Sequence, residues 1–226
     1  MTPANLVDHA ILSRRSTRGF LPDPVPLDTV RHILSVAARA PSGSNIQPWR
    51  VHVLAGEPLA RLSGALVGAF LGGAPEQPEY HYYPTVWRSP YIERRRETGW
   101  GLYQLVGVAR GDVEGSRRQR ARNYRFFDAP VGMVFTIDRD LELGSWLDFG
   151  MFLQNIMVAA RGRDLDTCPQ QSIANYPAIV SHALGIPDTQ MIVCGMALGH
   201  ADPSEPANDL ITRREPTEVF VTFHTD

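Results

Sequence analysis

The sequence SRRSTRGF, at residues 13–20, gathers positive charge and hydroxyl groups close to the N-terminus. Arginine presents planar, fork-shaped donors that match phosphate oxygens, and neighbouring hydroxyls can add further hydrogen bonds. The stretch is therefore compatible with a phosphate-bearing ligand, with a nucleic acid, or with a solvated helix end whose arginines complement the helix dipole. The candidate binding residues here are Arg14, Arg15, Ser16, Thr17 and Arg18.

A second polar stretch, APSGSNIQPWRVHVL at residues 40–54, places amide and hydroxyl side chains directly before an apolar run. Each amide side chain offers both a donor and an acceptor, so a pair of them can hydrogen-bond the edge of a planar heterocycle. The alternative interpretation is a polar helix cap followed by a turn. The candidate residues are Pro41, Ser42, Gly43, Ser44, Asn45 and Gln47.

Two later stretches add further candidates. TCPQQSIANYP, at residues 167–177, is expected to be a loop in which the amides after Pro169 are free to point at a ligand, although an ordinary loop would look the same. LITRREPTEVF places Arg213 and Arg214 together as a second cationic group, with a solvated pair as the alternative. The candidates in the first of these stretches are Pro169, Gln170, Gln171 and Ser172.

Several kinds of chemistry have little support. The sequence contains no phosphate-binding loop of the Walker type, no dinucleotide fingerprint and no G-x-S-x-G nucleophile motif. Its seven histidines are scattered, so no metal site is expected, and Cys168 and Cys194 form neither a disulfide framework nor a zinc pattern. Hydrolase and zinc-enzyme functions are therefore disfavoured, and the two thiols are expected to be free and buried.

The composition indicates one domain in a reducing compartment. A chain of 226 residues with 43% hydrophobic and 20% charged residues is ordinary for a globular domain and long enough to bury a core. The net charge of −2 argues against a general nucleic-acid-binding protein, which would show a basic excess. We see no signal peptide and no membrane-spanning run, and therefore expect a cytoplasmic location without nucleic-acid or membrane partners.

The predicted elements alternate without a regular βαβ rhythm, which favours an α+β fold. The stretch 144–163 is apolar almost all the way round, which predicts a helix at the centre of the core or at a subunit interface, with Ser145 and Asp148 at capping-box spacing. The apolar run at 130–137 predicts a strand covered on both faces. Helices are expected at 5–15, 27–40, 57–72, 92–111, 116–127, 144–163 and 176–185, strands at 49–56, 130–137, 191–200 and 217–225, and an irregular segment at 72–92.

In this order, RRSTRGF, APSGSNIQPWRVHVL, the apolar helix, ALGHAD and the late RREPTEVF resemble the FMN-dependent nitroreductase family. The stretch RNYRFFDAPVGMVFTIDRDLELGSWLDFGMFLQ is similar more particularly to enzymes that reduce nitrobenzoates. The resemblance spans nearly the whole chain. It implies a single domain over 1–226, with a small, mostly antiparallel sheet wrapped by helices and a helical excursion at about 70–125 that covers the flavin.

The resemblance also implies a homodimer with FMN at the interface and the C-terminal strand exchanged onto the partner. The 41–47 loop would reach the flavin from the other subunit, and the backbone near Gln171 and Ser172 would lie over the flavin N5. Many family members carry Glu-Gly or Gly-Phe at those two positions. The implied phosphate and ribityl contacts are Arg14, Arg15, Ser16 and Arg18, with Arg214 as the late cationic contact and Arg213 as the competing choice.

The activity implied by the resemblance is reduction of nitroaromatic compounds to hydroxylamines by NAD(P)H, with hydride passing through FMN and no side chain required as a catalytic acid. The sequence does not distinguish NADH from NADPH. Alternatives are another FMN-dependent reductase acting on quinones, alkenes or halogenated compounds, and a non-catalytic flavin-binding or nucleic-acid-binding protein. Aromatic and cationic residues that would suit a small aromatic substrate, or merely form a solvated helix face, are Tyr91, Arg94, Arg95, Trp100 and Tyr103.

Overall fold

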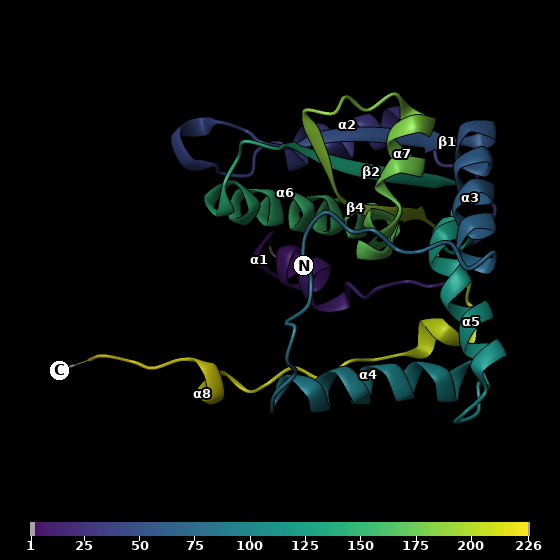
Figure 1. Cartoon of the computed structure of the whole chain (residues 1–226). Helices are drawn as coiled ribbons and strands as arrows, with labels where there is room; N and C mark the ends of the chain where they lie inside the picture. Colours follow the sequence, from purple (N-terminus) through teal and green to yellow (C-terminus); the bar gives the residue numbers. More distant parts are fainter. Residues whose placement is uncertain (1–2, 226) are drawn as a thin grey trace.

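The computed structural model describes residues 3–225 and shows a four-stranded sheet wrapped by helices (Figure 1). The strands lie in the order β1-β2-β4-β3, and each neighbouring pair is antiparallel. The prediction of an α+β fold with a small antiparallel sheet is therefore confirmed. The strands are β1 (Arg50–Ala55), β2 (Val131–Asp138), β3 (Asp166–Gln170) and β4 (Gln190–Gly199).

Helices form wherever the apolar spacing predicts them, with shifted ends. The expected helix at 116–127 is wrong in its second half, where Phe126 and Phe127 adopt positive φ angles of 51° and 53° that an α-helix does not allow. The α-helices are α1 (Pro3–Ser13), α2 (Leu27–Ala37), α3 (Gly56–Leu71), α4 (Tyr91–Leu105), α5 (Val113–Ala121), α6 (Leu143–Arg161), α7 (Pro177–Leu184) and α8 (Thr217–Phe220). The 3₁₀ turns are η1 (Gly43–Asn45), η2 (Arg122–Asp128), η3 (Gln171–Asn175) and η4 (Pro206–Asp209).

The core lies on both faces of the sheet, as the continuous apolar run of β2 predicts. Alternate β2 residues such as Met133 and Phe135 pack with α2 and α6 on one face. Val134 packs on the other face with α3, α7, η2 and η3. Cys168 and Cys194 are buried free thiols in these two clusters, as expected, and burial raises the pKa of the Cys168 thiol to about 11.

Within a single chain α6 is covered on one face only, and its expected capping box is wrong. Phe149, Phe152 and Ile156 pack onto the sheet, whereas Leu143 and Leu147 are 83% and 71% exposed, so α6 is not buried on all sides. The Ser145–Asp148 capping box does not form either, because the helix begins at Leu143 and its N-cap residue makes no side-chain bond. Both side chains are instead buried inside the first turns of the helix.

A strand replaces the expected loop at 167–177. Residues Asp166–Gln170 form β3, and η3 follows it. A proline within a run is tolerated in a strand at the sheet edge, where one side of the backbone needs no ladder partner. Because β3 is such an edge strand, Pro169 does not prevent its formation.

The expected strand at 217–225 is also wrong for the isolated chain. Residues 217–220 form the short helix α8, and the rest of the segment pairs with no strand among the described residues. In Figure 1 this C-terminal segment extends away from the sheet, and Val219, Phe220 and Phe223 are exposed. Among residues 3–225, no helix combines the length and apolar character required to cross a membrane.

Candidate functional site

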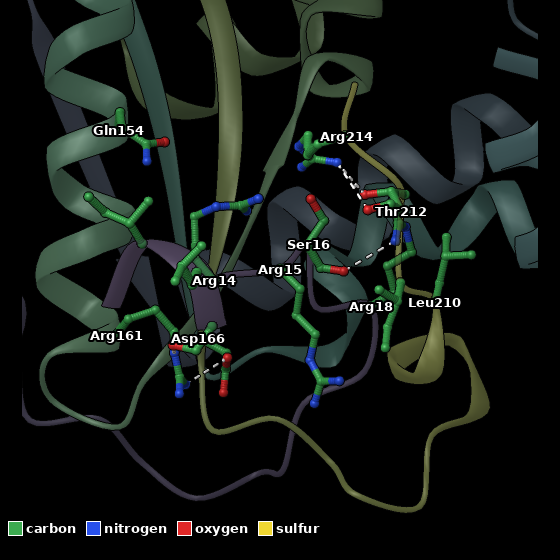
Figure 2. Close-up of a pocket in the computed structure, with 14 residues that line it drawn as sticks. Arg14, Arg15, Ser16, Arg18, Gln154, Arg161, Asp166, Leu210, Thr212 and Arg214 are labelled. Carbon is green, nitrogen blue, oxygen red and sulfur yellow. Dashed lines mark hydrogen bonds and ion pairs between the residues drawn. The ribbon is translucent and has the colours of Figure 1, made fainter. Parts of the chain in front are cut away.

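A cavity of about 780 Å³ lies between the N-terminal segment, α6, β3 and the C-terminal segment (Figure 2). Five arginines line it, and Asp166 is the one acidic residue in its wall. Asp166 is already paired with Arg161 at 3.0 Å. The lining residues are Ile11, Leu12, Ser13, Arg14, Arg15, Ser16, Arg18, Gln154, Arg161, Asp166, Leu210, Ile211, Thr212 and Arg214. The structure thus brings the two predicted arginine groups, about 200 residues apart in the sequence, to one site.

The N-terminal segment reaches this cavity by lying along the free edge of β3. After α1 ends at Ser13, Ser16 forms a parallel bridge with Thr167, and the Thr17 N–H donates to the Thr167 carbonyl at 3.1 Å. The Arg18 N–H donates to Asn208 Oδ1 at 2.7 Å, which ties the segment to η4. Thr17 is buried and does not line the cavity, whereas Ser16 and Arg18 on either side of it do.

The electrostatics of the cavity are unbalanced. Burial, and next the nearby charge of Arg214, lower the pKa of the Arg14 guanidinium. In Figure 2 the Arg14 side chain extends toward Arg214. Within residues 3–225, neither arginine has a carboxylate within ion-pair distance. Two like charges held together without a counter-ion form a site for an anion.

The two late arginines have different surroundings. Arg214 lines the cavity, and its Nη1 donates to Thr212 Oγ1 at 2.8 Å. Arg213 does not line the cavity and instead pairs with Glu97 of α4 at 3.6 Å. Of the two candidates, the structure therefore brings only Arg214 to the other arginines.

A second cavity, of about 600 Å³, is mostly apolar. It lies along the same two elements as the first, against the N-terminal half of α6 and the C-terminal end of β3. The lining residues are Tyr80, His81, Tyr82, Leu143, Trp146, Phe149, Gly150, Leu153, Pro169, Gln170, Gln171, Met191, Val193 and Cys194. A cationic compartment and an aromatic one are thus placed along one helix and one strand. Such a pair of sites suits a ligand with an anionic end and a planar end.

The last residue of β3 and the residues just after it are held by hydrogen bonds but leave two polar atoms without a partner among the described residues. Gln170 is buried and its Nε2 donates to the Asn123 carbonyl at 2.6 Å, while Gln171 Nε2 donates to Asn175 Oδ1 at 3.1 Å. Gln170 Oε1 and Ser172 Oγ are buried and have no hydrogen-bond partner among the described residues. Because buried polar atoms are nearly always paired, these two atoms are candidates for contact with a ligand.

The glycine at the neighbouring strand permits this arrangement. A Cβ atom at Gly195 of β4 would lie 2.5 Å from Ile173 Cγ1 of η3. No real side chain allows so close a contact, so only glycine lets η3 pack against β4 at this point. The position of Gln171 in the wall of the second cavity therefore depends on a residue without a side chain.

The 41–47 loop is ordered but lies apart from the two cavities just described. The Gly43 N–H donates to Asp148 Oδ2 at 3.0 Å, and the Gln47 N–H donates to Ser42 Oγ at 3.0 Å. Pro41 lines a separate hollow on α6, with Trp146 among its other residues. Within this chain, the loop residues are therefore not brought to the arginines. Positive φ angles occur in the loop at Ser44, Asn45 and Gln47.

The chain is similar in sequence and in structure to proteins of one known family. The sequence model described as Nitroreductase family matches residues 11–200. This chain belongs to the nitroreductase family. It is 47% identical to the chloronitrobenzene nitroreductase of Comamonas testosteroni, over 99% of each chain. It is 42% identical to a 4-nitrobenzoate reductase of Pseudomonas putida, over 96% of this chain and 94% of the relative.

Solved structures give the same family. The FMN and NADPH-dependent nitroreductase NfnB from Sphigopyxis sp. strain HMH superposes with a TM-score of 0.93 at 36% identity, covering 97% of this chain and 99% of the other. The FMN-dependent nitroreductase NfnB from Mycobacterium smegmatis, solved in complex with NADPH, superposes with a TM-score of 0.94 at 29% identity, covering 98% and 99%. The predicted nitroreductase-like fold is confirmed.

The expected substrate residues of this nitroreductase lie on α4, away from the second cavity. The guanidinium groups of Arg88 and Arg94 lie 4.8 Å and 5.9 Å from the centroid of the Tyr91 ring. Tyr91 also lines a further cavity, of about 640 Å³, whose wall includes Arg214. The Arg95 guanidinium lies 4.5 Å from the Trp87 ring. Trp100 and Tyr103 contact each other edge to face, with ring centroids 6.3 Å apart. The structure thus gathers Tyr91 and Arg94 near Arg214 but does not bring all five predicted residues into one pocket.

Sequence reasoning missed several residues that line the two cavities. Gln154, Arg161 and Asp166 line the cationic cavity, and Tyr80 and Trp146 line the apolar one. Trp146 and Gln154 lie within the stretch at 122–154 that resembles nitrobenzoate reductases, whereas Tyr80, Arg161 and Asp166 belong to none of the quoted motifs. The signal that could have found Tyr80 is the density of aromatic residues in YHYYPTVW at 80–87.

We expect replacement of Asp148 by alanine to loosen the 41–47 loop. The variant removes the carboxylate that accepts the Gly43 N–H, a bond worth about 1 kcal/mol. Amide hydrogen exchange at residues 42–47 should become faster, while exchange in β2 should stay unchanged. Glu142→Ala, at the same helix but without a bond to the loop, is the control. Unchanged exchange at Gly43 would show that the bond does not hold the loop.

Proposed function

We propose that this chain is an FMN-dependent nitroreductase that uses NAD(P)H to reduce nitroaromatic compounds to hydroxylamines, with nitrobenzoates among its substrates. The observation that carries the proposal is the pair Arg14 and Arg214. These two guanidinium groups lie together in one cavity, and no carboxylate among the described residues neutralises them. A phosphate monoester is the kind of ligand that such a pair binds, through charge-assisted hydrogen bonds.

The remaining residues of the site fit FMN. The first cavity would hold the phosphate and ribityl chain through Arg14, Ser16, Arg18 and Arg214, with Arg15 at its rim. The second cavity runs along the same helix and strand, and its aromatic wall and the residues after Pro169 would hold a planar ring. The unpartnered Gln170 Oε1 and Ser172 Oγ add polar atoms that the protein itself leaves unsatisfied.

When bound, FMN supplies hydride transfer, which leaves binding and electrostatics to the protein. Positive charge beside the ring would stabilise the negative charge that accumulates on reduction. Of the two arginines that could supply it, Arg14 lines the cavity assigned to the phosphate and not the aromatic one, and Arg213 is engaged with Glu97. The aromatic wall formed by Tyr80, Trp146 and Phe149 would exclude water from the reacting ring face. No side chain is needed as an acid.

We further propose that the chain is a single domain over 1–226 and acts as a cytoplasmic homodimer. Leu143 and Leu147 leave an apolar stripe on α6 that one chain does not cover, and Phe220 and Phe223 are exposed on the extended C-terminal segment. Burial of such residues between two copies is favourable, at about 25 cal/mol per Å² of apolar surface. In such a dimer, the residues of the 41–47 loop could serve the site of the other subunit: Pro41, Ser42, Gly43, Asn45 and Gln47.

The visible absorption spectrum of the purified protein tests this function. We expect flavin bands that bleach when NADH or NADPH is added without oxygen and return when 4-nitrobenzoate is added. Bands that bleach but do not return would show that the protein is a flavin enzyme that does not reduce 4-nitrobenzoate. A protein that stays colourless after incubation with FMN would overturn the proposal. Parallel titrations with NADH and NADPH also give the nicotinamide preference.

A further inference from the structure

The C-terminal segment at residues 210–216 brings Arg214 to the arginine-lined cavity of about 780 Å³, which is called the anion cavity below. The segment itself is part of no helix or strand. Its two ends have extended backbone, at Leu210 and at Pro216. Arg214 Nη1 donates to the Arg213 carbonyl at 2.9 Å and to Thr212 Oγ1 at 2.8 Å, but these bonds lie within the segment and do not tie it to the rest of the fold. In Figure 1 this segment runs alongside α4, so α4 is the element that can hold it in place.

One face of α4 contacts the segment at three points. Arg94 forms an ion pair with Glu215, with its Nη2 2.9 Å from Glu215 Oε1 and its Nε 3.1 Å from the same atom. Glu97 pairs with Arg213 at 3.6 Å. A Cβ atom at Gly101 would lie 3.1 Å from Leu210 Cδ1, so the segment approaches the helix closely at that point.

The spacing of these contacts shows a matched register. Positions 94, 97 and 101 recur at three and four residues, which places them on one face of the helix. Both chain neighbours of Arg214, namely Arg213 and Glu215, pair with this face of the helix. Arg214 itself lines the anion cavity and also the cavity beside Tyr91 and Arg94, so the two ion pairs fix the chain on either side of it.

We infer that the face of α4 formed by Arg94, Glu97 and Gly101 sets the register of the C-terminal segment and so positions Arg214 for the phosphate of FMN. The inference rests on the proposed function and assigns a new role to α4, whose residues were expected to serve only the substrate. Arg94 and Glu97 are positioning residues, because they act through their neighbours and do not touch the phosphate.

The order of charges gives the register its specificity. On the helix the positive Arg94 precedes the negative Glu97. On the segment the complementary charges are Glu215, which pairs with Arg94, and Arg213, which pairs with Glu97. A slip by one residue would bring Arg214 opposite Glu97 and Pro216 opposite Arg94, so the Arg94 ion pair would be lost and the Arg214 charge would be neutralised. Both pairs are exposed, and exposed pairs add little to stability. Their effect is on which side chain faces the cavity.

The test compares FMN with riboflavin, which lacks the phosphate, in a charge-swap cycle. The variants are Arg94→Glu, Glu215→Arg and the double swap, with dissociation constants measured from flavin fluorescence on the FMN-free protein. We expect Arg94→Glu to weaken FMN binding roughly tenfold, as for loss of one charge-assisted hydrogen bond, and the double swap to restore it. Riboflavin binding should not change in any variant. Arg96→Glu is the control, because it makes the same charge change on α4 at an exposed residue outside the contacting face.

Three results would overturn the inference. Arg94→Glu could affect FMN no more than Arg96→Glu, it could weaken riboflavin as much as FMN, or the double swap could fail to restore binding. Should Arg94→Glu not fold, Glu97→Arg with Arg213→Glu supplies an independent cycle with the same expectations. Failure of the proposed function is distinct, since the wild-type protein would then bind neither flavin.

Discussion

Replacing Arg14 by methionine is expected to lower the affinity for FMN by ~10- to 100-fold while raising the stability of the FMN-free protein. The loss of affinity follows from the removal of charge-assisted hydrogen bonds to the phosphate, worth about 1.5–3 kcal/mol. The gain in stability follows from the surroundings of the guanidinium, since burial and the charge of Arg214 disfavour its charged form and lower its pKa. Arginine stays protonated at any ordinary pH, so the folded protein bears that unfavourable energy.

The two opposite effects are measured on the same samples. FMN affinity comes from fluorescence titration, and stability from thermal unfolding with and without saturating FMN. We expect the unfolding temperature of the variant to exceed that of the wild type without FMN and to fall below it with FMN. Arg39→Met, at an exposed arginine outside the cavity, should change neither quantity. A variant that loses stability without FMN would show that Arg14 supports the fold rather than the ligand.

The sequence predicted the elements whose signals are local. The apolar spacing of Val30, Ile33 and Ala37 defines α2, and the continuous apolar runs of β2 and β4 mark strands covered on both faces. β3 was missed because Pro169 and three polar residues hide a short edge strand whose partner lies in β4. Edge pairing is a tertiary interaction, and a single segment carries no sign of it.

The sequence predicted those residues of the candidate site that lie within a motif. It missed those that reach the site only through the packing of distant elements. The SRRSTRGF stretch and Arg214 meet as the resemblance implies, but Arg161 and Asp166 join them only because α6 and β3 pack together. The choice between Arg213 and Arg214 was open in the sequence because adjacent arginines are equivalent there. Glu97, more than 100 residues earlier, distinguishes them by pairing with one of the two.

Replacing Phe152 by alanine is expected to lower the free energy of unfolding by ~3–5 kcal/mol, the usual range for a buried phenylalanine. Phe152 is 2% exposed and lies at the centre of the α6 face that packs on the sheet. Its ring stacks on Trp49 with centroids 4.7 Å apart and planes 7° apart, and it meets Phe135 and Phe149 edge to face. Urea unfolding of the FMN-free protein, with a nearly unchanged m value, measures the loss.

The same substitution should also loosen the 41–47 loop, because Trp49 lies two residues after that loop and stacks on the Phe152 ring. We expect faster amide exchange at residues 42–49 and a change in tryptophan fluorescence in the alanine variant. Phe152→Leu is the matched control, since it keeps most of the volume and should lose less stability. Equal losses in the two variants would mean that filling the space does not determine stability here. Unchanged exchange in the loop would mean that the Trp49 stack does not couple the loop to α6.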